Sequence, residues 1–111
     1  MKLLVLILNK VEKLEEVLEG FLEVGVTGAT IIDSIGMGHV ISEEVPIFAG
    51  LRFMFAGAKP HNKMIFSVIR NNKEEPVIKV LKKILGDLGQ PGTGIVFTLP
   101  LDRVEGLKPD I

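Results

Sequence analysis

Two segments of the sequence combine residue types that could bind a charged ligand. One is residues 36–62, which opens with the pattern Gly-Met-Gly, and the other is residues 86–94, which is rich in glycine. Glycine allows backbone N–H groups to approach a phosphate closely, so residues 86–94 could form part of an anion site. A connection from a helix to a strand also requires glycine, and this requirement explains the same pattern without a ligand.

Both histidines of the chain, His39 and His61, lie in the first segment. With Glu43 and Glu44 they could bind a metal ion, but their spacing matches no known metal site. Two solvated loop histidines explain them better. A Ser–His–acid triad drawn from Ser42, His39 and Glu43 would consist of loop neighbours without supporting residues. We therefore expect no metal site, no catalytic residue and no enzymatic activity.

Composition narrows the class of partner. The 111 residues are enough for one domain with a single core, so we expect one domain over residues 1–111. A formal net charge of −1 gives no electrostatic reason to expect nucleic acid or an anionic membrane surface as the main partner. No apolar run approaches the roughly 18 residues that a membrane span needs. The absence of cysteine is compatible with a cytoplasmic protein, which is the location we expect.

Hydrophobic periodicity indicates the elements that position these segments. In the first half it predicts a strand over residues 2–8, a helix that begins near residue 11 and a strand over residues 29–35. Asn9 is a plausible cap for the helix, and Gly25 ends it. The first half is therefore a strand–helix–strand unit.

The second half repeats this order. It predicts a strand from about residue 63 to 69, a helix capped by Asn71 or Asn72 that ends at Gly89, and a strand over residues 95–99. Two such units with right-handed crossovers form an α+β, ferredoxin-like βαββαβ fold. We expect an antiparallel four-stranded sheet with both helices on one face and a long loop between the second and third strands.

The first strand is apolar on both of its faces. Leucine, valine and isoleucine fill both alternating sets, which are Leu3, Val5, Ile7 and Leu4, Leu6, Leu8. A sheet that is covered by helices on one face only normally alternates apolar with polar residues. A monomer would therefore expose a broad hydrophobic face, which monomers rarely do. We expect a closed homo-oligomer that covers this face.

The long loop contains its own apolar pattern. Residues 46–56 have apolar side chains at helical spacing, which predicts a short amphipathic helix. Packing against its own domain or a neighbouring subunit explains this helix better than docking of a partner protein, because exposed apolar clusters are costly unless covered. If the loop does bind a partner, the contact residues are Phe48, Leu51, Arg52 and Phe55.

Several motifs occur in one order along nearly the whole chain. They are Gly25-Val26-Thr27-Gly28-Ala29-Thr30, Gly36-Met37-Gly38, Gly89-x-x-Gly92-x-Gly94 before a strand with Phe97, and Asp102-Arg103-Val104. In this order the motifs resemble the PII family of nitrogen-regulatory signalling proteins. The resemblance implies a ferredoxin-like domain that forms compact homotrimers and binds ATP or ADP in clefts between subunits. It also implies a long loop, the T-loop, that moves onto a partner such as a transporter or a metabolic enzyme.

The resemblance assigns roles to both segments. Residues 36–62 would be the T-loop, and residues 86–94 would be the nucleotide-facing B-loop. The family's modifiable tyrosine corresponds to Phe48, which has no hydroxyl, so uridylylation at that position is excluded. The ligand-binding residues that the resemblance implies are Thr30, Gly36, Met37, Gly38, Gly89, Gly92, Thr93, Gly94 and Arg103.

Several positions depart from the family pattern. Where the B-loop of the family has a lysine after its last glycine, this chain has Ile95, and near the places of two tail arginines it has Gly106 and Lys108. A phosphate site that lacks several cations should bind ATP weakly or not at all. Cations in the long loop that could replace them are Arg52, Lys59 and Lys63.

Two hypotheses of different classes follow. The first is a trimeric PII-like sensor that binds a nucleotide or another small anion and signals through residues 36–62. The second is a structural homo-oligomeric scaffold, or a partner-docking protein, with no ligand-dependent switch. Other functions of this fold fit less well. The chain has no Tyr or Trp to stack on RNA, and the turn after the first strand lacks the arginine of an acylphosphatase.

Overall fold

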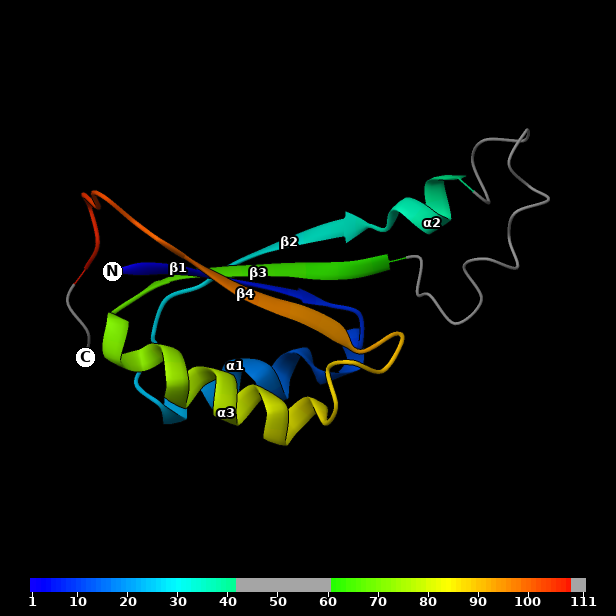
Figure 1. The fold of residues 1–111 in the computed structure, drawn as a ribbon, viewed down its shortest axis with the longest axis horizontal. Coiled ribbons are helices and arrows are strands. Elements are labelled where there is room, and N and C mark those ends of the chain that lie inside the picture. The colour runs from blue at the N-terminus through cyan, green and yellow to red at the C-terminus, as the bar shows by residue number, and fades with distance from the viewer. Residues whose placement is uncertain (42–60, 109–111) are drawn as a thin grey trace.

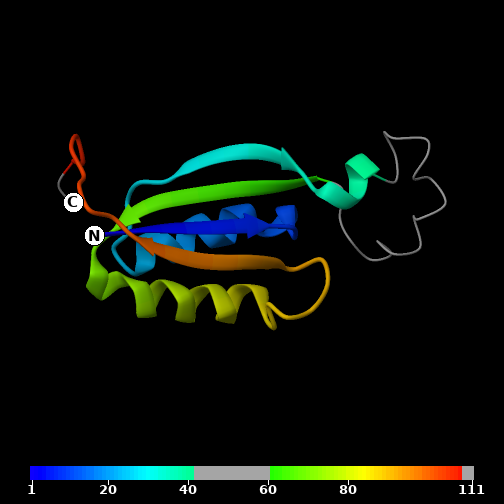
Figure 2. The same cartoon turned by 45° about the horizontal axis from the view of Figure 1, so that its top comes forward.

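The computed structural model describes residues 1–41 and 61–108. The elements are strands β1 (Lys2–Leu8), β2 (Thr30–Ile35), β3 (His61–Ile69) and β4 (Gly94–Pro100), the α-helices α1 (Leu14–Glu23), α2 (Met37–His39) and α3 (Glu74–Leu85), and the 3-10 helices η1 (Val11–Lys13) and η4 (Asn71–Lys73). The sheet has the strand order β2-β3-β1-β4, and all neighbouring strands are antiparallel. Both long helices cover the same face of this sheet (Figures 1 and 2). The predicted ferredoxin-like fold is confirmed.

The core lies between the sheet and the two long helices. Leu4, Leu6 and Leu8 of β1 alternate along the strand and have no exposed surface. They form one cluster with buried residues of α1 and α3 that recur at helical spacing, namely Val17, Phe21, Val77, Leu81 and Leu85. A Cβ on Gly20 would lie 2.7 Å from Cδ1 of Ile84, so glycine at this position allows α1 to approach α3 closely.

The other face of the sheet has no helix over it. The strand register places the apolar residues that alternate with the core set on this open face, which comprises Leu3, Val5, Ile7, Ile32, Met64, Phe66, Val68, Ile95, Phe97 and Leu99. At the two edge strands the side chains of the open face are strongly exposed, with 46% for Ile32, 56% for Ile95 and 42% for Phe97. The open face is therefore exposed mainly at its edge strands, whereas Val5 on the inner strand β1 is only 7% exposed.

Element boundaries differ from the predicted ones where the pattern continued past the real end. Helix α3 ends at Leu85, because Gly86 has a φ of 79° that breaks the helix, and not at Gly89. The predicted caps are wrong as well. Each long helix follows a 3-10 turn, and the N-cap positions are taken by lysine or arginine without a side-chain cap, not by Asn9, Asn71 or Asn72. The helix predicted over residues 46–56 lies outside the described residues.

One finding bears on membranes. Among the helices in the described part of the chain, none combines the length and the apolar character needed to cross a bilayer.

Candidate ligand-binding site

The predicted ligand-binding residues fall into two groups at opposite ends of the sheet. The loop-end group lies where β2 ends and β4 begins, and it consists of Gly36, Met37, Gly38, Gly89, Gly92, Thr93 and Gly94. Thr30 and Arg103 lie at the other end, where β2 begins and β4 has ended. Strand β4 is seven residues long, which at about 3.3 Å per residue corresponds to about 20 Å between the groups. Figure 1 shows the same separation, with the N-terminus and the end of β4 at one end and α2 at the other.

Thr93 fixes residues 86–94 to the end of β1. Its side chain is 1% exposed, and its carbonyl oxygen accepts hydrogen bonds from the N–H groups of Asn9 and Lys10, at 3.1 and 3.3 Å. Its hydroxyl oxygen is buried and has no hydrogen-bond partner in the described part of the chain. Thr93 is therefore enclosed by its own chain and does not present its side chain to solvent.

Gly94 has a structural requirement of its own. A Cβ at this position would lie 2.6 Å from the carbonyl oxygen of Ile7, and the φ of 151° is one that other residues rarely adopt. Glycine is needed here for β4 to pack beside β1, whether or not a ligand is bound.

Within residues 86–94, several backbone donors are already used, namely the N–H groups of Gly86, Gly89, Gln90 and Thr93. The N–H of Gly89 donates to one oxygen of the Asp87 carboxylate at 2.8 Å. The side-chain amide of Gln90 donates to the other carboxylate oxygen at 3.4 Å. This is an Asx-type turn that stabilises the loop locally. The predicted ligand contact of Gly89 stays a prediction, because its N–H must leave Asp87 before it can donate to a ligand.

At the base of residues 36–62, Gly36 caps a single helical turn. Its carbonyl oxygen accepts a hydrogen bond from the N–H of Val40 at 3.3 Å, and Met37 is 71% exposed. The sequence predicts that the Gly36–Gly38 motif is the beginning of a long loop. The structure instead begins helix α2 there, in direct continuation of β2.

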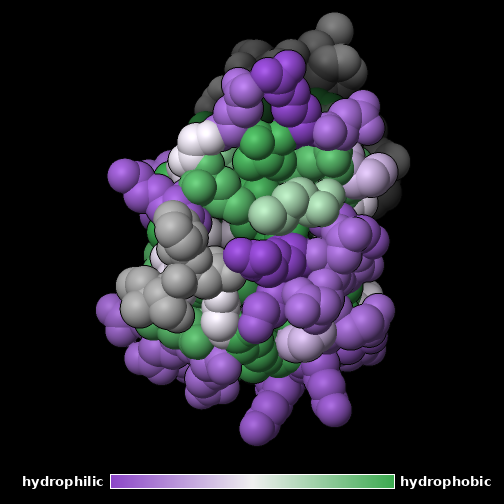
Figure 3. All heavy atoms as spheres, turned by 90° about the vertical axis from the view of Figure 1, so that its left-hand side faces the viewer, coloured by the Kyte–Doolittle hydropathy of each residue, from purple (hydrophilic) through white to green (hydrophobic). Residues whose placement is uncertain are grey.

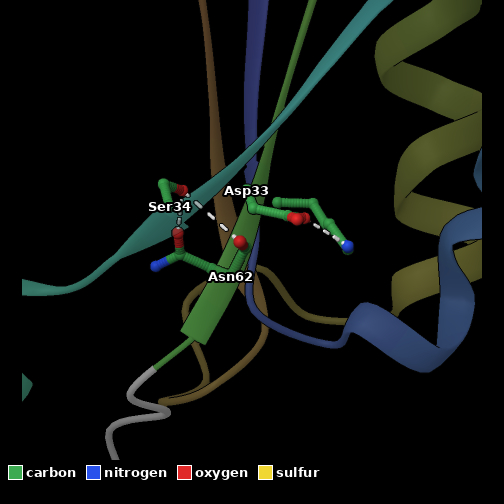
Figure 4. Close-up of polar contacts among 4 residues, drawn as sticks. Asp33, Ser34 and Asn62 are labelled. Carbon is green, nitrogen blue, oxygen red and sulfur yellow. Dashed lines mark hydrogen bonds and ion pairs between the residues drawn. The ribbon is translucent and has the colours of Figure 1, made fainter.

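Two cross-strand pairs hold β2 to β3 below this turn. The Ser34 hydroxyl donates to the side-chain amide oxygen of Asn62, and Lys63 forms an ion pair with Asp33. Figure 4 shows the two pairs on opposite sides of the sheet. Lys63, a candidate replacement cation, is thus engaged by Asp33 on the helix side. The other two, Arg52 and Lys59, lie outside the described residues, as do the predicted partner contacts Phe48, Leu51 and Phe55.

The opposite end of the sheet contains a cavity of about 490 Å³. Thr30 lines it together with the rest of residues 25–30, the end of β3 and the segment Gly106–Lys108. Arg103 does not line it. Its side chain is 79% exposed, pairs with Glu105 at 2.5 Å, and borders a neighbouring cavity that shares Lys108. Of the two predicted ligand residues at this end, only Thr30 therefore lines this cavity.

Sequence reasoning missed two cations of this cavity, Arg70 and Lys73. Both follow β3 within four residues, in a stretch for which the sequence pattern predicts only a helix cap. A basic pair immediately after a strand was the available signal, but its proximity to residues 25–30 depends on the pairing of β2 with β3.

The arrangement is suited to binding an anion. No group of three or more potential metal ligands occurs among the residues in ranges 1–41 and 61–108. The glycine-rich turns and the basic cavity offer hydrogen-bond donors and positive charge, which are the groups that bind anions.

Comparison with protein families agrees with the order of motifs. A sequence model of the family described as nitrogen regulatory protein P-II matches residues 1–110. A search of curated proteins returns no significant match. The family match confirms the resemblance inferred from the motifs. Proteins of this family are non-enzymatic signal transducers with nitrogen- or nucleotide-sensing regulatory roles, as the sequence predicted for this chain.

Proposed function

The chain belongs to the P-II family of nitrogen regulatory proteins, and from that premise we propose that it is a homotrimeric regulator with ligand sites between its subunits. The ligand is a nucleotide or another small anion. Residues 36–62 transmit its binding to a target protein, such as a transporter or a metabolic enzyme.

The separation of the two residue groups supports this proposal most directly. Residues 36–38 and 92–94 lie at one end of the sheet, and Thr30 lies at the other. A single chain cannot bring the two groups onto one small ligand across about 20 Å of strand. A site that uses both groups needs the loop end of one subunit and the opposite end of its neighbour.

The open face supplies a reason for the subunits to associate. Its apolar side chains extend over all four strands, and the most exposed of them lie on β2 and β4 at the two edges. Contiguous apolar surface of this kind marks protein interfaces. A closed three-fold assembly would cover it in each subunit with the equivalent face of its neighbours.

The base of residues 36–62 is suited to transmit binding. Gly36 follows β2 directly, and the Ser34–Asn62 hydrogen bond joins the two strands at the point where the segment leaves the sheet. A ligand that contacts residues 36–38 would therefore act on the segment at its attachment point. The target protein would be contacted farther along, at Phe48, Leu51, Arg52 and Phe55.

A second candidate function has its own support. Gly94 is required for packing against Ile7, and the N–H of Gly89 is satisfied by Asp87. Both features fit a scaffold whose glycine-rich loop has a purely structural role. In that case the chain would still assemble but would bind no effector.

Isothermal titration distinguishes the two functions. We expect the protein to bind at least one of ATP, ADP, AMP, a cyclic dinucleotide or bicarbonate, with one site per subunit interface. Light scattering on the same sample should give a mass near three times 12.1 kDa. A trimer that binds none of these compounds would favour the scaffold, and a monomer would contradict both functions.

A further inference from the structure

The cavity at the end of the sheet opposite α2 has an unusual charge balance. Among residues 1–41 and 61–108, fourteen line it, of which three are cationic, Arg70, Lys73 and Lys108, and none is acidic. The whole chain has 14 acidic and 13 basic residues, so the excess of cations in this cavity does not follow from the overall composition. Figure 3 faces this end of the molecule and shows strongly hydrophilic side chains directly beside apolar ones. The cavity is therefore a local concentration of positive charge in a chain of net negative charge.

Lys73 is a cation that the fold places directly against Gly25. It ends the 3-10 turn η4, and its ammonium nitrogen lies 2.7 Å from the position that a Cβ on Gly25 would occupy. Gly25 also has a φ of 85°, so the glycine both forms the turn and leaves room for the lysine. The position of Lys73 is thus determined by the turn that forms the cavity wall.

The positive charge of Lys73 is not neutralised by a nearby acid. Within residues 1–41 and 61–108, its ammonium group forms no ion pair and no hydrogen bond. The acidic residue next to it, Glu74, pairs with Lys2. A half-buried ammonium without a counter-charge is favourable when an anion occupies the adjacent space.

The cavity wall also supplies neutral polar groups. Thr27 and Thr30 contribute hydroxyls, and both line the cavity. The loop between them is held in place because the carbonyl oxygen of Gly28 accepts a hydrogen bond from Ser67, a residue that is 3% exposed. Hydroxyls on a fixed loop, together with several cations, are a suitable environment for a phosphate or a similar oxyanion.

We propose that Lys73, with Arg70 and Lys108, binds the anionic group of the effector in this cavity. The proposal rests on the proposed function, because it assigns the charged part of that ligand to one side of the intersubunit cleft. It also explains why the chain can lack cations at positions 95 and 106, because Arg70 and Lys73, which follow β3, would supply positive charge in their place. Three cations, with no acid among the described lining residues, fit a multiply charged oxyanion, such as the phosphate chain of a nucleotide.

Titration of the full-length protein with inorganic pyrophosphate and with ATP tests this assignment. We expect Lys73→Gln to weaken binding of both compounds at least about tenfold, because a charge-assisted contact is lost. Lys73→Arg keeps the charge and should retain binding within a few-fold. The matched control is Lys79→Gln, which removes the same charge from the outer surface of α3. It should leave both affinities unchanged, and the thermal midpoints of all variants should agree with that of the unsubstituted protein.

The outcomes separate this assignment from the proposed function. If Lys73→Gln binds pyrophosphate and ATP as tightly as the unsubstituted protein, the role of Lys73 is wrong, while the regulatory function stands. If the unsubstituted protein binds neither compound, the oxyanion assignment is wrong. Isothermal titration with AMP, cyclic dinucleotides and bicarbonate then tests the proposed function. Weakening by Lys79→Gln as large as that by Lys73→Gln would also contradict the assignment, since it would reflect net charge alone.

Discussion

The two faces of the sheet have similar amino-acid content but very different surroundings. On the helix side, Leu4, Leu6 and Leu8 are completely buried by α1 and α3. On the open face, Ile95, Phe97 and Leu99 of β4 are each more than 40% exposed. Burial within one chain therefore does not account for the apolar residues of β4 on the open face. Exposed apolar residues of this kind are typical of a surface that another chain covers.

The largest expected effect concerns the open face. Phe97→Asp places a charge at the centre of the apolar strand β4, where burial against another subunit would leave it unpaired. We expect the mass measured by light scattering to fall from three times 12.1 kDa to 12.1 kDa, with the circular dichroism spectrum unchanged. The matched control is Leu22→Asp on α1, a residue that is 61% exposed but lies outside the open face. An intact trimer in Phe97→Asp would show that the open face is not the interface.

The second prediction contrasts the faces by stability. In the monomeric Phe97→Asp background, Leu6→Ala should lower the free energy of unfolding by about 2–5 kcal/mol, because it creates a cavity in the core. Ile95→Ala in the same background should cost less than about 1 kcal/mol, because this side chain is 56% exposed in the single chain. Urea denaturation measures both values. Equal losses would mean that the open face is already covered within the monomer.

The contrast between the two faces of the sheet could be predicted from the sequence, because the alternation of residues along each strand determines which side chains share a face. The apolar character of Leu3, Val5 and Ile7 already implied a second buried face, and the register of the sheet confirmed where these residues lie. The end of α3 was mispredicted because Leu88 continues the helical spacing beyond Gly86. At that point the backbone conformation of one glycine overrides the periodicity of the side chains.

The candidate site was less predictable for a related reason. The glycine motifs identified the loop end, but glycine gives no indication of which backbone groups are already used. The hydrogen bond from Gly89 to Asp87 became visible only in three dimensions. Similarly, Arg70 and Lys73 reach residues 25–30 through strand pairing between segments about 40 residues apart in the sequence. Such contacts have no local signal in one sequence.

A third prediction separates structural glycine from permissive glycine. Gly94→Ala should lower the free energy of unfolding by about 1–3 kcal/mol, because the new methyl group meets the carbonyl oxygen of Ile7 and the backbone conformation is strained. Gly28→Ala is the matched control, since a Cβ there meets no atom within 4 Å. Thermal denaturation compares the two variants. A stable Gly94→Ala variant would leave ligand contact as the only reason for glycine at this position.

The smallest effects should come from the two polar pairs at the base of residues 36–62, and they again distinguish the faces. Ser34→Ala removes the partner of Asn62, which is 8% exposed, so an amide is left unsatisfied in a buried position. We expect a loss of about 1–2 kcal/mol. Asp33→Asn breaks the ion pair with Lys63, but the Asp33 side chain is 83% exposed, so the loss should be below about 1 kcal/mol and should shrink in high salt. Chemical denaturation at two ionic strengths measures both. If Asp33→Asn costs more than Ser34→Ala, the attachment of the segment depends on the helix side of the sheet and not on the open face.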